Sequence, residues 1–267
     1  MKFPSNQFKA ALRAGQSTTG IFIGLVSPTA MEIAASAGFD WLLIDGEHGP
    51  NNPVTVLPQL QAAAAYGVPV IVRPVNHDPA LIKQYLGIGA QTLLVPMVES
   101  AAEAEALVRA LRYPPHGIRG VGTALERGAR WNAVEDYFKQ ADEEMCLIVQ
   151  IESRAGLDNL DAILKVDGVD GVFIGPADLA ASLGHLGQPG HPEVKTAIES
   201  ALRRIKDAGR AAGVFATDPA TATLYRSCGA SFIAVGADTA ILRNAAVALA
   251  AKFREGATAG VTAGAAY

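Results

Sequence analysis

The chain has 267 residues, half of them hydrophobic, and a formal net charge of −4 from 22 basic and 26 acidic side chains. No stretch approaches the roughly 18 uncharged apolar residues that a membrane helix needs, and no basic run with interleaved aromatic residues suits a nucleic-acid backbone. The polar N-terminus lacks the apolar core of a signal peptide. We therefore expect one soluble, cytoplasmic domain with no membrane or nucleic-acid partner.

Short apolar runs alternate with longer alanine-rich stretches of helical spacing, which is the pattern of repeated βα units. Eight such runs predict strands at residues 20–25, 40–45, 69–73, 92–97, 146–151, 170–174, 212–216 and 231–236. Continuous apolar runs suit a parallel sheet that is covered on both faces. The sequence thus favours an α/β fold, a closed (β/α)8 (TIM) barrel over residues 1–255, with an open doubly wound sheet as the main alternative.

Two segments interrupt this alternation. Between the fourth and fifth predicted strands lies Arg112-Tyr-Pro-Pro-His-Gly-Ile-Arg-Gly-Val-Gly122, whose prolines and glycines predict a shaped loop rather than a helix. Residues 256–267 are small and have little to bury, so we expect a tail, or an arm that contacts a neighbouring subunit.

Polar residues recur where the predicted strands end, and α/β barrels place their active sites at the carboxyl ends of strands. The tips of the second, third, fifth and sixth runs carry, respectively, Asp45-Gly-Glu-His48, Arg73, Gln150-Ile-Glu152 and Gly175-Pro-Ala-Asp178. Charged side chains that gather at one end of a barrel indicate a functional site.

Glu152 and Asp178 are expected at the ends of neighbouring strands, which lie about 4.8 Å apart, so that both carboxylates can reach one cation. Two carboxylates, together with water and substrate oxygens, suit hard divalent ions such as Mg²⁺ or Mn²⁺. The alternative is that both acids cap the helices that follow, as Asp178 before Leu179 is placed to do. Their position at the functional end favours the metal site.

His48 directly follows a strand tip and has acids beside it, which makes it the candidate base. Asp45, three residues earlier, is expected to orient the imidazole and raise its basicity. Glu47 is either an outer partner of a metal site or a salt-bridge residue. The alternative for His48 is a structural hydrogen bond in a loop, which is the role we predict for His77, His116, His185 and His191.

Arg73 carries a permanent charge that suits an enolate or keto oxygen in a water-poor barrel mouth. The backbone N–H groups of Gly175-Pro-Ala-Asp178 enter a helix and are placed to hold a carboxylate. A Schiff-base aldolase needs a lysine inside the barrel, whereas the lysines of this chain fall in predicted helices, termini or lower loops. A metal ion is therefore the better electron sink.

Several motifs in the same order resemble the class II pyruvate aldolases related to 4-hydroxy-2-oxoheptane-1,7-dioate aldolase, nearly from end to end. They are Trp41-Leu-Leu-Ile-Asp-Gly-Glu-His48, Val72-Arg-Pro74, Leu94-Val-Pro-Met97, Arg112-Tyr-Pro-Pro-His-Gly-Ile-Arg-Gly120, Val149-Gln-Ile-Glu152 and Phe173-Ile-Gly-Pro-Ala-Asp-Leu179. The resemblance implies a lyase of aromatic compound catabolism. It would split the heptanedioate reversibly into pyruvate and succinate semialdehyde.

The resemblance also implies a barrel that assembles as a homohexamer, a trimer of dimers, with its final helix exchanged between subunits. The implied cofactor is Mg²⁺, Mn²⁺ or Co²⁺. By motif, Glu152 and Asp178 would bind the metal, His48 would accept the proton and Arg73 would stabilise the transition state. Gln150 and the backbone around Ala177 would contact pyruvate.

One departure concerns the basicity of His48. In a relative, the helix after the third strand carries an aspartate that follows a Lys-Gln-x-Leu segment, whereas here Lys83-Gln-Tyr-Leu86 is followed by Gly87. The resemblance then implies either that Asp45 alone acts on the histidine or that the base is weaker. Arg127 is placed either to reach a distal substrate carboxylate or to form a surface salt bridge.

Two alternatives stand beside the heptanedioate reaction. One is the same chemistry on a sugar-derived acid, such as 5-keto-4-deoxy-glucarate or a 2-keto-3-deoxy-rhamnonate, because the motifs of the pyruvate half do not separate these substrates. The other is a barrel that binds keto acids without turnover.

Overall fold

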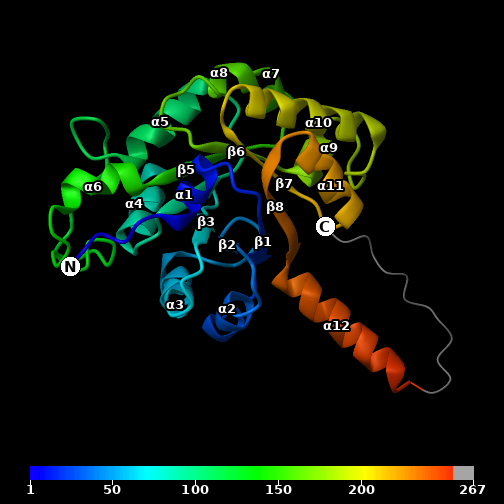
Figure 1. Cartoon of the computed structure of the whole chain (residues 1–267), viewed down its shortest axis with the longest axis horizontal. Helices are drawn as coiled ribbons and strands as arrows, with labels where there is room; N and C mark the ends of the chain where they lie inside the picture. The colour runs from blue at the N-terminus through cyan, green and yellow to red at the C-terminus, as the bar shows by residue number, and fades with distance from the viewer. Residues whose placement is uncertain (255–267) are drawn as a thin grey trace.

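The computed structural model of the protein describes residues 1–254, so the tail predicted at 256–267 lies outside the described residues. Eight parallel strands form a closed barrel in chain order, and β1 pairs with β8 to close it (Figure 1). The strands are β1 (Thr18–Ile23), β2 (Trp41–Asp45), β3 (Val70–Arg73), β4 (Thr92–Val95), β5 (Cys146–Ile151), β6 (Gly171–Ile174), β7 (Ala211–Phe215) and β8 (Ala230–Ala237). The predicted (β/α)8 barrel is confirmed, and the open sheet is excluded.

Helices surround the barrel, and many begin where the sequence supplies a cap and a proline. The helices are α1 (Gln7–Arg13), α2 (Pro28–Ala35), α3 (Pro53–Ala64), α4 (Pro79–Gly87), α5 (Ala101–Leu111), α6 (Tyr137–Glu144), α7 (Arg154–Asp158), α8 (Leu160–Ile163), α9 (Pro176–Ser182), α10 (Pro192–Asp207), α11 (Pro219–Ser227) and α12 (Asp238–Lys252). In α3 the Asn52 side chain accepts from the backbone N–H of Thr55, and Pro53 opens the first turn. None of the described helices is long and apolar enough to cross a membrane.

All eight predicted strands are present, with ends that differ from the apolar runs by a few residues. The run at 92–97 forms a strand only as far as Val95. Pro96 has no N–H to donate to a neighbouring strand, and Met97 adopts a left-handed backbone conformation with φ of 53°. The chain therefore leaves the barrel at Pro96 and enters the loop that follows β4.

Aromatic side chains fill the lower part of the barrel, and α1 closes it from below. Phe8 of α1 contacts Trp41 and Phe232, with ring centroids 6.0 Å and 5.6 Å away, respectively. All three side chains are at most 2% exposed. The neighbouring strands make room for these rings with glycines, because a Cβ at Gly20 would lie 2.2 Å from Trp41, and one at Gly213 would lie 2.2 Å from Phe232. The barrel is thus a packed core with its open end at the strand tips.

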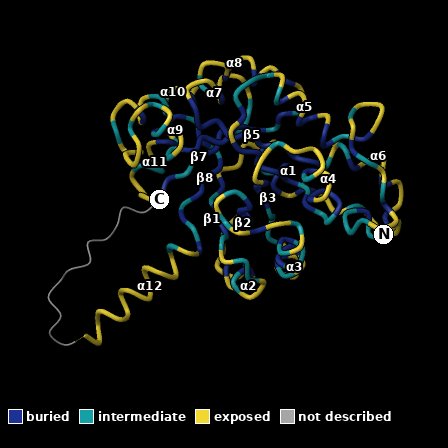
Figure 2. Tube along the Cα trace, turned by 180° about the vertical axis from the view of Figure 1, so that it is seen from behind, coloured by how far each residue is buried: buried dark blue, intermediate teal, exposed yellow. Residues whose placement is uncertain are grey.

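The last helix, α12, projects away from the barrel (Figure 1) and is exposed along most of its length (Figure 2). Apolar side chains take part in this exposure, since Leu242 is 57%, Leu249 is 58% and Phe253 is 81% exposed. In one chain these residues leave apolar surface in water, which a protein normally covers.

Gly213→Ala tests whether the aromatic core of the barrel needs a glycine beside the Phe232 ring. The added methyl group would meet the fully buried Phe232 ring, so we expect a loss of about 1–3 kcal/mol in stability from overpacking, seen as a lower midpoint of urea unfolding. Gly190→Ala is the control, because its Cβ would have its nearest neighbour at 3.9 Å. Equal midpoints for the two variants would contradict this account of the core.

Candidate active site

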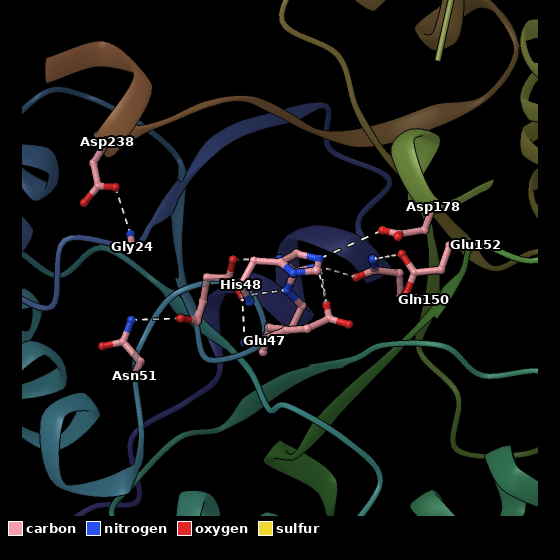
Figure 3. Close-up of polar contacts among 10 residues, drawn as sticks. Gly24, Glu47, His48, Asn51, Gln150, Glu152, Asp178 and Asp238 are labelled. Carbon is pink, nitrogen blue, oxygen red and sulfur yellow. Dashed lines mark hydrogen bonds and ion pairs between the residues drawn. The ribbon is translucent and has the colours of Figure 1, made fainter. Parts of the chain in front are cut away.

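The structure brings the predicted site residues together at the carboxyl ends of the strands (Figure 3). Asp45 and Arg73 end β2 and β3, and the two residues lie opposite each other in the pairing of these strands. Glu152 directly follows β5, and Asp178 lies in the first turn of α9, which follows β6. Because β5 pairs with β6, the two acids stand on neighbouring strand ends, as the sequence predicts.

Arg73 is the buried centre of the polar network, with only 4% of its surface exposed. Its Nε and Nη2 donate to the two oxygens of Asp45 at 2.9 Å and 2.7 Å. Its Nη1 lies 2.7 Å from Glu47 Oε2 and donates to Gln150 Oε1 at 3.4 Å. The guanidinium also lies over the ring of Phe22, 4.9 Å from its centroid. The arginine is thus held in one orientation by partners on three strands.

The expected contact between Asp45 and the imidazole of His48 needs a correction. Both Asp45 oxygens face Arg73, and Oδ1 also accepts from the backbone N–H groups of Glu47 and His48 at 3.0 Å and 3.3 Å. Asp45 therefore fixes the backbone of this loop rather than the ring. The Nε2 of His48 instead lies 3.8 Å from Glu47 Oε2 and 3.9 Å from Asp178 Oδ2. The His48 side chain is 62% exposed, so it is open to a substrate.

Glu152 is 2% exposed and has a defined partner for each oxygen. Its Oε1 accepts from the backbone N–H of Met97 at 2.9 Å, and its Oε2 accepts from the side-chain amide of Gln150. A Cβ at Gly175 would lie 2.3 Å from Oε2, so the carboxylate fits only because this position is glycine. The orientation of Glu152 is thus set by its surroundings.

Burial and neighbouring acids raise the pKa values of two acids of the site, Glu152 and Glu47. Burial raises the pKa of Glu152 to about 7, the hydrogen bond from Gln150 opposes this, and the charge of Glu47 adds to it. Burial likewise raises the pKa of Glu47 to about 6, against the nearby Arg73, and the charge of Asp178 contributes to the rise. Carboxylates that repel each other in a buried site bind either a proton or a cation. This cluster therefore has the charge to hold a divalent ion.

Three supporting residues, Asn51, Gln59 and Asp238, are not indicated by any sequence motif. Asn51 Nδ2 donates to the carbonyl of Asp45 at 2.8 Å, and the buried Gln59 donates to Asn51 Oδ1 at 2.7 Å. At the base of α12, Asp238 accepts from the backbone N–H of Gly24 at 2.8 Å, in the loop after β1 (Figure 3). Asn51 and Asp238 stand where helices begin and Gln59 lies inside α3, so no pattern points to these loop contacts.

Two residues that the sequence connects with the site lie elsewhere. Arg127 donates to the carbonyl of Ile88 at 3.1 Å and lines a cavity of about 250 Å³ with Pro69, which precedes β3. It therefore lies toward the opposite end of the barrel, where it does not reach a substrate at the strand tips of its own chain and forms no salt bridge with a residue in the described range 1–254. Gly87 ends α4, and a Cβ there would lie 3.3 Å from Glu126 Cγ. A glutamate side chain thus occupies the space beside Gly87.

A second group of possible metal ligands lies between α9 and α10. The ligand atoms of His185, His191 and Glu193 lie within 4.8 Å of one another. However, the two imidazole rings are stacked, with centroids 3.6 Å apart and an angle of 17° between their planes. An imidazole nitrogen binds a metal ion in the plane of its ring, and an ion in the plane of one of these stacked rings lies outside the plane of the other. His191 accepts from the N–H of Glu193, and His185 contacts the Glu193 carboxylate, so structural hydrogen bonds account for both histidines.

Glu152→Gln tests the effect of the buried carboxylate on stability. The pKa of Glu152 is about 7 in the folded protein, against an ordinary value of 4.5, so the folded state binds the proton more tightly. Ionisation therefore destabilises the fold as pH rises from about 4.5 to about 7. In metal-free protein at pH 8 we expect the variant to be more stable than the wild type, by up to about 3 kcal/mol.

Thermal unfolding with chelator, measured at pH 8 and at pH 4.5, checks this expectation. The difference should shrink at the lower pH, where Glu152 is protonated in the folded protein and about half protonated in the unfolded chain. Glu105→Gln changes an exposed glutamate and should have little effect at either pH. If the Glu152→Gln variant is less stable than the wild type at pH 8, ionisation of Glu152 does not destabilise the fold.

Comparisons with known proteins agree with this geometry. Residues 18–245 match the family described as HpcH/HpaI aldolase/citrate lyase. The chain is 58% identical over 259 residues to the hydroxypyruvate/pyruvate aldolase of Pseudomonas aeruginosa, covering 97% of each protein. It is also 58% identical over 254 residues to the 4-hydroxy-2-oxo-heptane-1,7-dioate aldolase of Klebsiella pneumoniae, covering 95% of this chain and 96% of that protein. The crystal structure of an HpcH/HpaI aldolase/citrate lyase family protein from Burkholderia cenocepacia matches with a TM-score of 0.88 and 41% identity, covering 94% of this chain and 100% of that chain. This chain therefore belongs to the HpcH/HpaI aldolase/citrate lyase family.

Proposed function

We propose that this chain is a divalent-metal-dependent aldolase that reversibly cleaves 4-hydroxy-2-oxoheptane-1,7-dioate to pyruvate and succinate semialdehyde. The observation that carries the proposal is the cluster of buried acids beside Arg73 at the carboxyl end of the barrel. The family and the name of the Klebsiella pneumoniae relative support the reaction and the substrate. Small molecules would be the partners, and the cytoplasm the location.

Glu152 and Asp178 are the residues that would hold the metal. Their carboxylates suit the hard ions Mg²⁺ or Mn²⁺, the resemblance adds Co²⁺, and the raised pKa of Glu152 fits a site that a cation completes. When bound, such an ion would polarise the 2-keto group and stabilise negative charge on the enolate of pyruvate.

Arg73 and Gln150 would orient the keto acid and stabilise its enolate. The guanidinium is permanently charged and buried, and a fixed positive charge acts more strongly away from water. Gln150 lies between Arg73 and Glu152 and presents an amide group to the mouth. The backbone around Ala177, in the first turn of α9, would bind the substrate carboxylate through its N–H groups.

His48 would accept the proton from the C4 hydroxyl of the substrate. Its exposed ring is free to meet the substrate, and its Nε2 lies 3.8 Å from Glu47 Oε2 and 3.9 Å from Asp178 Oδ2. As O4 loses its proton, the C3–C4 bond breaks, the aldehyde leaves and the electron pair passes to the enolate of pyruvate. Protonation at C3 then gives pyruvate. Asp45 contributes by fixing the loop backbone and Arg73.

Exchange of the methyl hydrogens of pyruvate in deuterated water tests the metal-dependent half of this reaction. We expect rapid exchange with Mg²⁺ or Mn²⁺, and loss of exchange with chelator. Substitution of a residue that only supports a metal ligand typically costs 10 to 100-fold. Glu152 would be a ligand itself, so Glu152→Gln should lower the rate by at least about 100-fold. Glu105→Gln should exchange like the wild type. Undiminished exchange in chelator would refute the metal-dependent mechanism.

Pyruvate release from a panel of 4-hydroxy-2-oxo acids then identifies the substrate. A second candidate donor is hydroxypyruvate, favoured by the name of the Pseudomonas aeruginosa relative, which is as similar to this chain as the heptanedioate aldolase. Preference for sugar-derived acids would replace the proposed substrate. Neither exchange nor release from metal-loaded protein would favour a barrel that only binds keto acids.

We also propose a homohexamer, a trimer of dimers, in which α12 is exchanged between subunits. The support is the exposed apolar surface of α12, which includes Ile241, Leu242, Leu249 and Phe253. A helix that leaves its own barrel can bury such side chains against a neighbouring copy.

Leu242→Glu combined with Leu249→Glu tests the role of α12 in assembly. Two buried charges at an interface would oppose association, so we expect a smaller mass in light scattering at equal concentration. Ile33→Glu, at a side chain of α2 that is 67% exposed, should retain the wild-type mass. An unchanged mass for the double variant would show that α12 does not hold the subunits together.

A further inference from the structure

His77 joins two loops at the mouth of the barrel. It lies after β3, and its Nε2 is 2.5 Å from the carbonyl oxygen of Pro96, which follows β4. A carbonyl oxygen can only accept a hydrogen bond, so Nε2 must carry the hydrogen and donate it. This bond fixes the tautomer of a neutral His77 and ties the β3 loop to the β4 loop.

The peptide unit that His77 holds also bonds to Glu152. The C=O of Pro96 and the N–H of Met97 belong to one planar peptide group, and in a trans peptide they point in opposite directions. His77 bonds the C=O, while the N–H donates to Glu152 Oε1 at 2.9 Å. The peptide is thus held from one side by an imidazole and from the other by a carboxylate.

Met97 has an unusual backbone for a bulky residue, with φ of 53°. Outside glycine, this left-handed conformation is strained and persists only where the surroundings impose it. Burial of the side chain does not provide the reason, because Met97 is 44% exposed. The two hydrogen bonds on the preceding peptide do provide one, since they fix the direction in which its N–H points.

We propose that His77 is a positioning residue for Glu152. By holding the Pro96–Met97 peptide, it keeps the N–H aimed at Oε1 and so orients the carboxylate toward the ion. The inference rests on the proposed function, in which Glu152 is a metal ligand. Groups that orient a ligand in this way commonly change metal affinity by 10 to 100-fold. Gln150, on the other oxygen, acts through a separate contact and remains in place.

Mn²⁺ binding to the otherwise metal-free protein, followed by the electron paramagnetic resonance signal of free Mn²⁺, tests this role without measuring activity. We expect His77→Ala to weaken binding by about 10-fold. His77→Gln retains an N–H donor at a similar reach and should recover most of the affinity. His116→Ala, at an exposed histidine in the 112–122 loop, should bind like the wild type.

A second pair of variants tests whether His77 acts by holding the strained peptide. Glycine adopts a positive φ without strain, so Met97→Gly should retain Mn²⁺ binding. In the Met97→Gly background, His77→Ala should then cost clearly less affinity than in the wild type. Unfolding midpoints of all variants separate a change at the site from a loss of fold.

The outcomes distinguish this inference from the proposed function. If Glu152→Gln loses Mn²⁺ binding while His77→Ala binds like the wild type, the positioning role is wrong and the metal site stands. If Glu152→Gln binds Mn²⁺ as tightly as the wild type, the metal site itself is wrong. His77→Gln as weak as His77→Ala, or an equal cost of His77→Ala in both backgrounds, would also overturn the role of the hydrogen bond.

Discussion

The ion pair between Arg73 and Asp45 is the interaction on which the rest of the site depends. Both side chains end paired strands and are buried, and two parallel hydrogen bonds fix the guanidinium plane. Taking such charges out of water is costly, so the pair is weak grounds for stability alone. Its value lies in what it orients. Asp45 uses a remaining acceptor position for the backbone of the loop that carries His48. Arg73 reaches Gln150, which in turn contacts Glu152.

The charge of the mouth follows from this arrangement. Arg73 directly pairs with Asp45 and Glu47, which leaves Glu152 without an ion pair among the described residues and Asp178 with only the Nε2 of His48, 3.9 Å away. The pKa values of Glu47 and Glu152 are raised, first by burial and then by neighbouring acids. A divalent ion between the strand ends would supply the missing positive charge. In the proposed site, Arg73 is thus a fixed cation, and a divalent ion would be an exchangeable one.

The strands and the functional end of the barrel could be predicted because they depend on simple patterns. Apolar runs define strands, and the polar residue that ends each run must lie at the rim. The hydrogen-bond partner of each side chain at the rim could not be predicted, because it depends on how the side chains of neighbouring strands are oriented. Asp45 turns to Arg73 rather than to the His48 ring. His77, expected to be structural, bonds a carbonyl in the next loop, and Arg127 lies toward the far end of the barrel.

The base of α12 connects the proposed assembly with the mouth of the barrel. Asp238 accepts from the N–H groups of Gly24 and Leu25, which belong to the loop after β1. Gly24 in turn lies close to Gly49, next to His48, since a Cβ at Gly49 would lie 3.3 Å from Gly24 Cα. A carboxylate at the start of the exposed helix is therefore two contacts away from the loop of the proposed base. Asp238 thus ties the base of the helix that we propose to be exchanged to the loop after β1, beside the loop that carries His48.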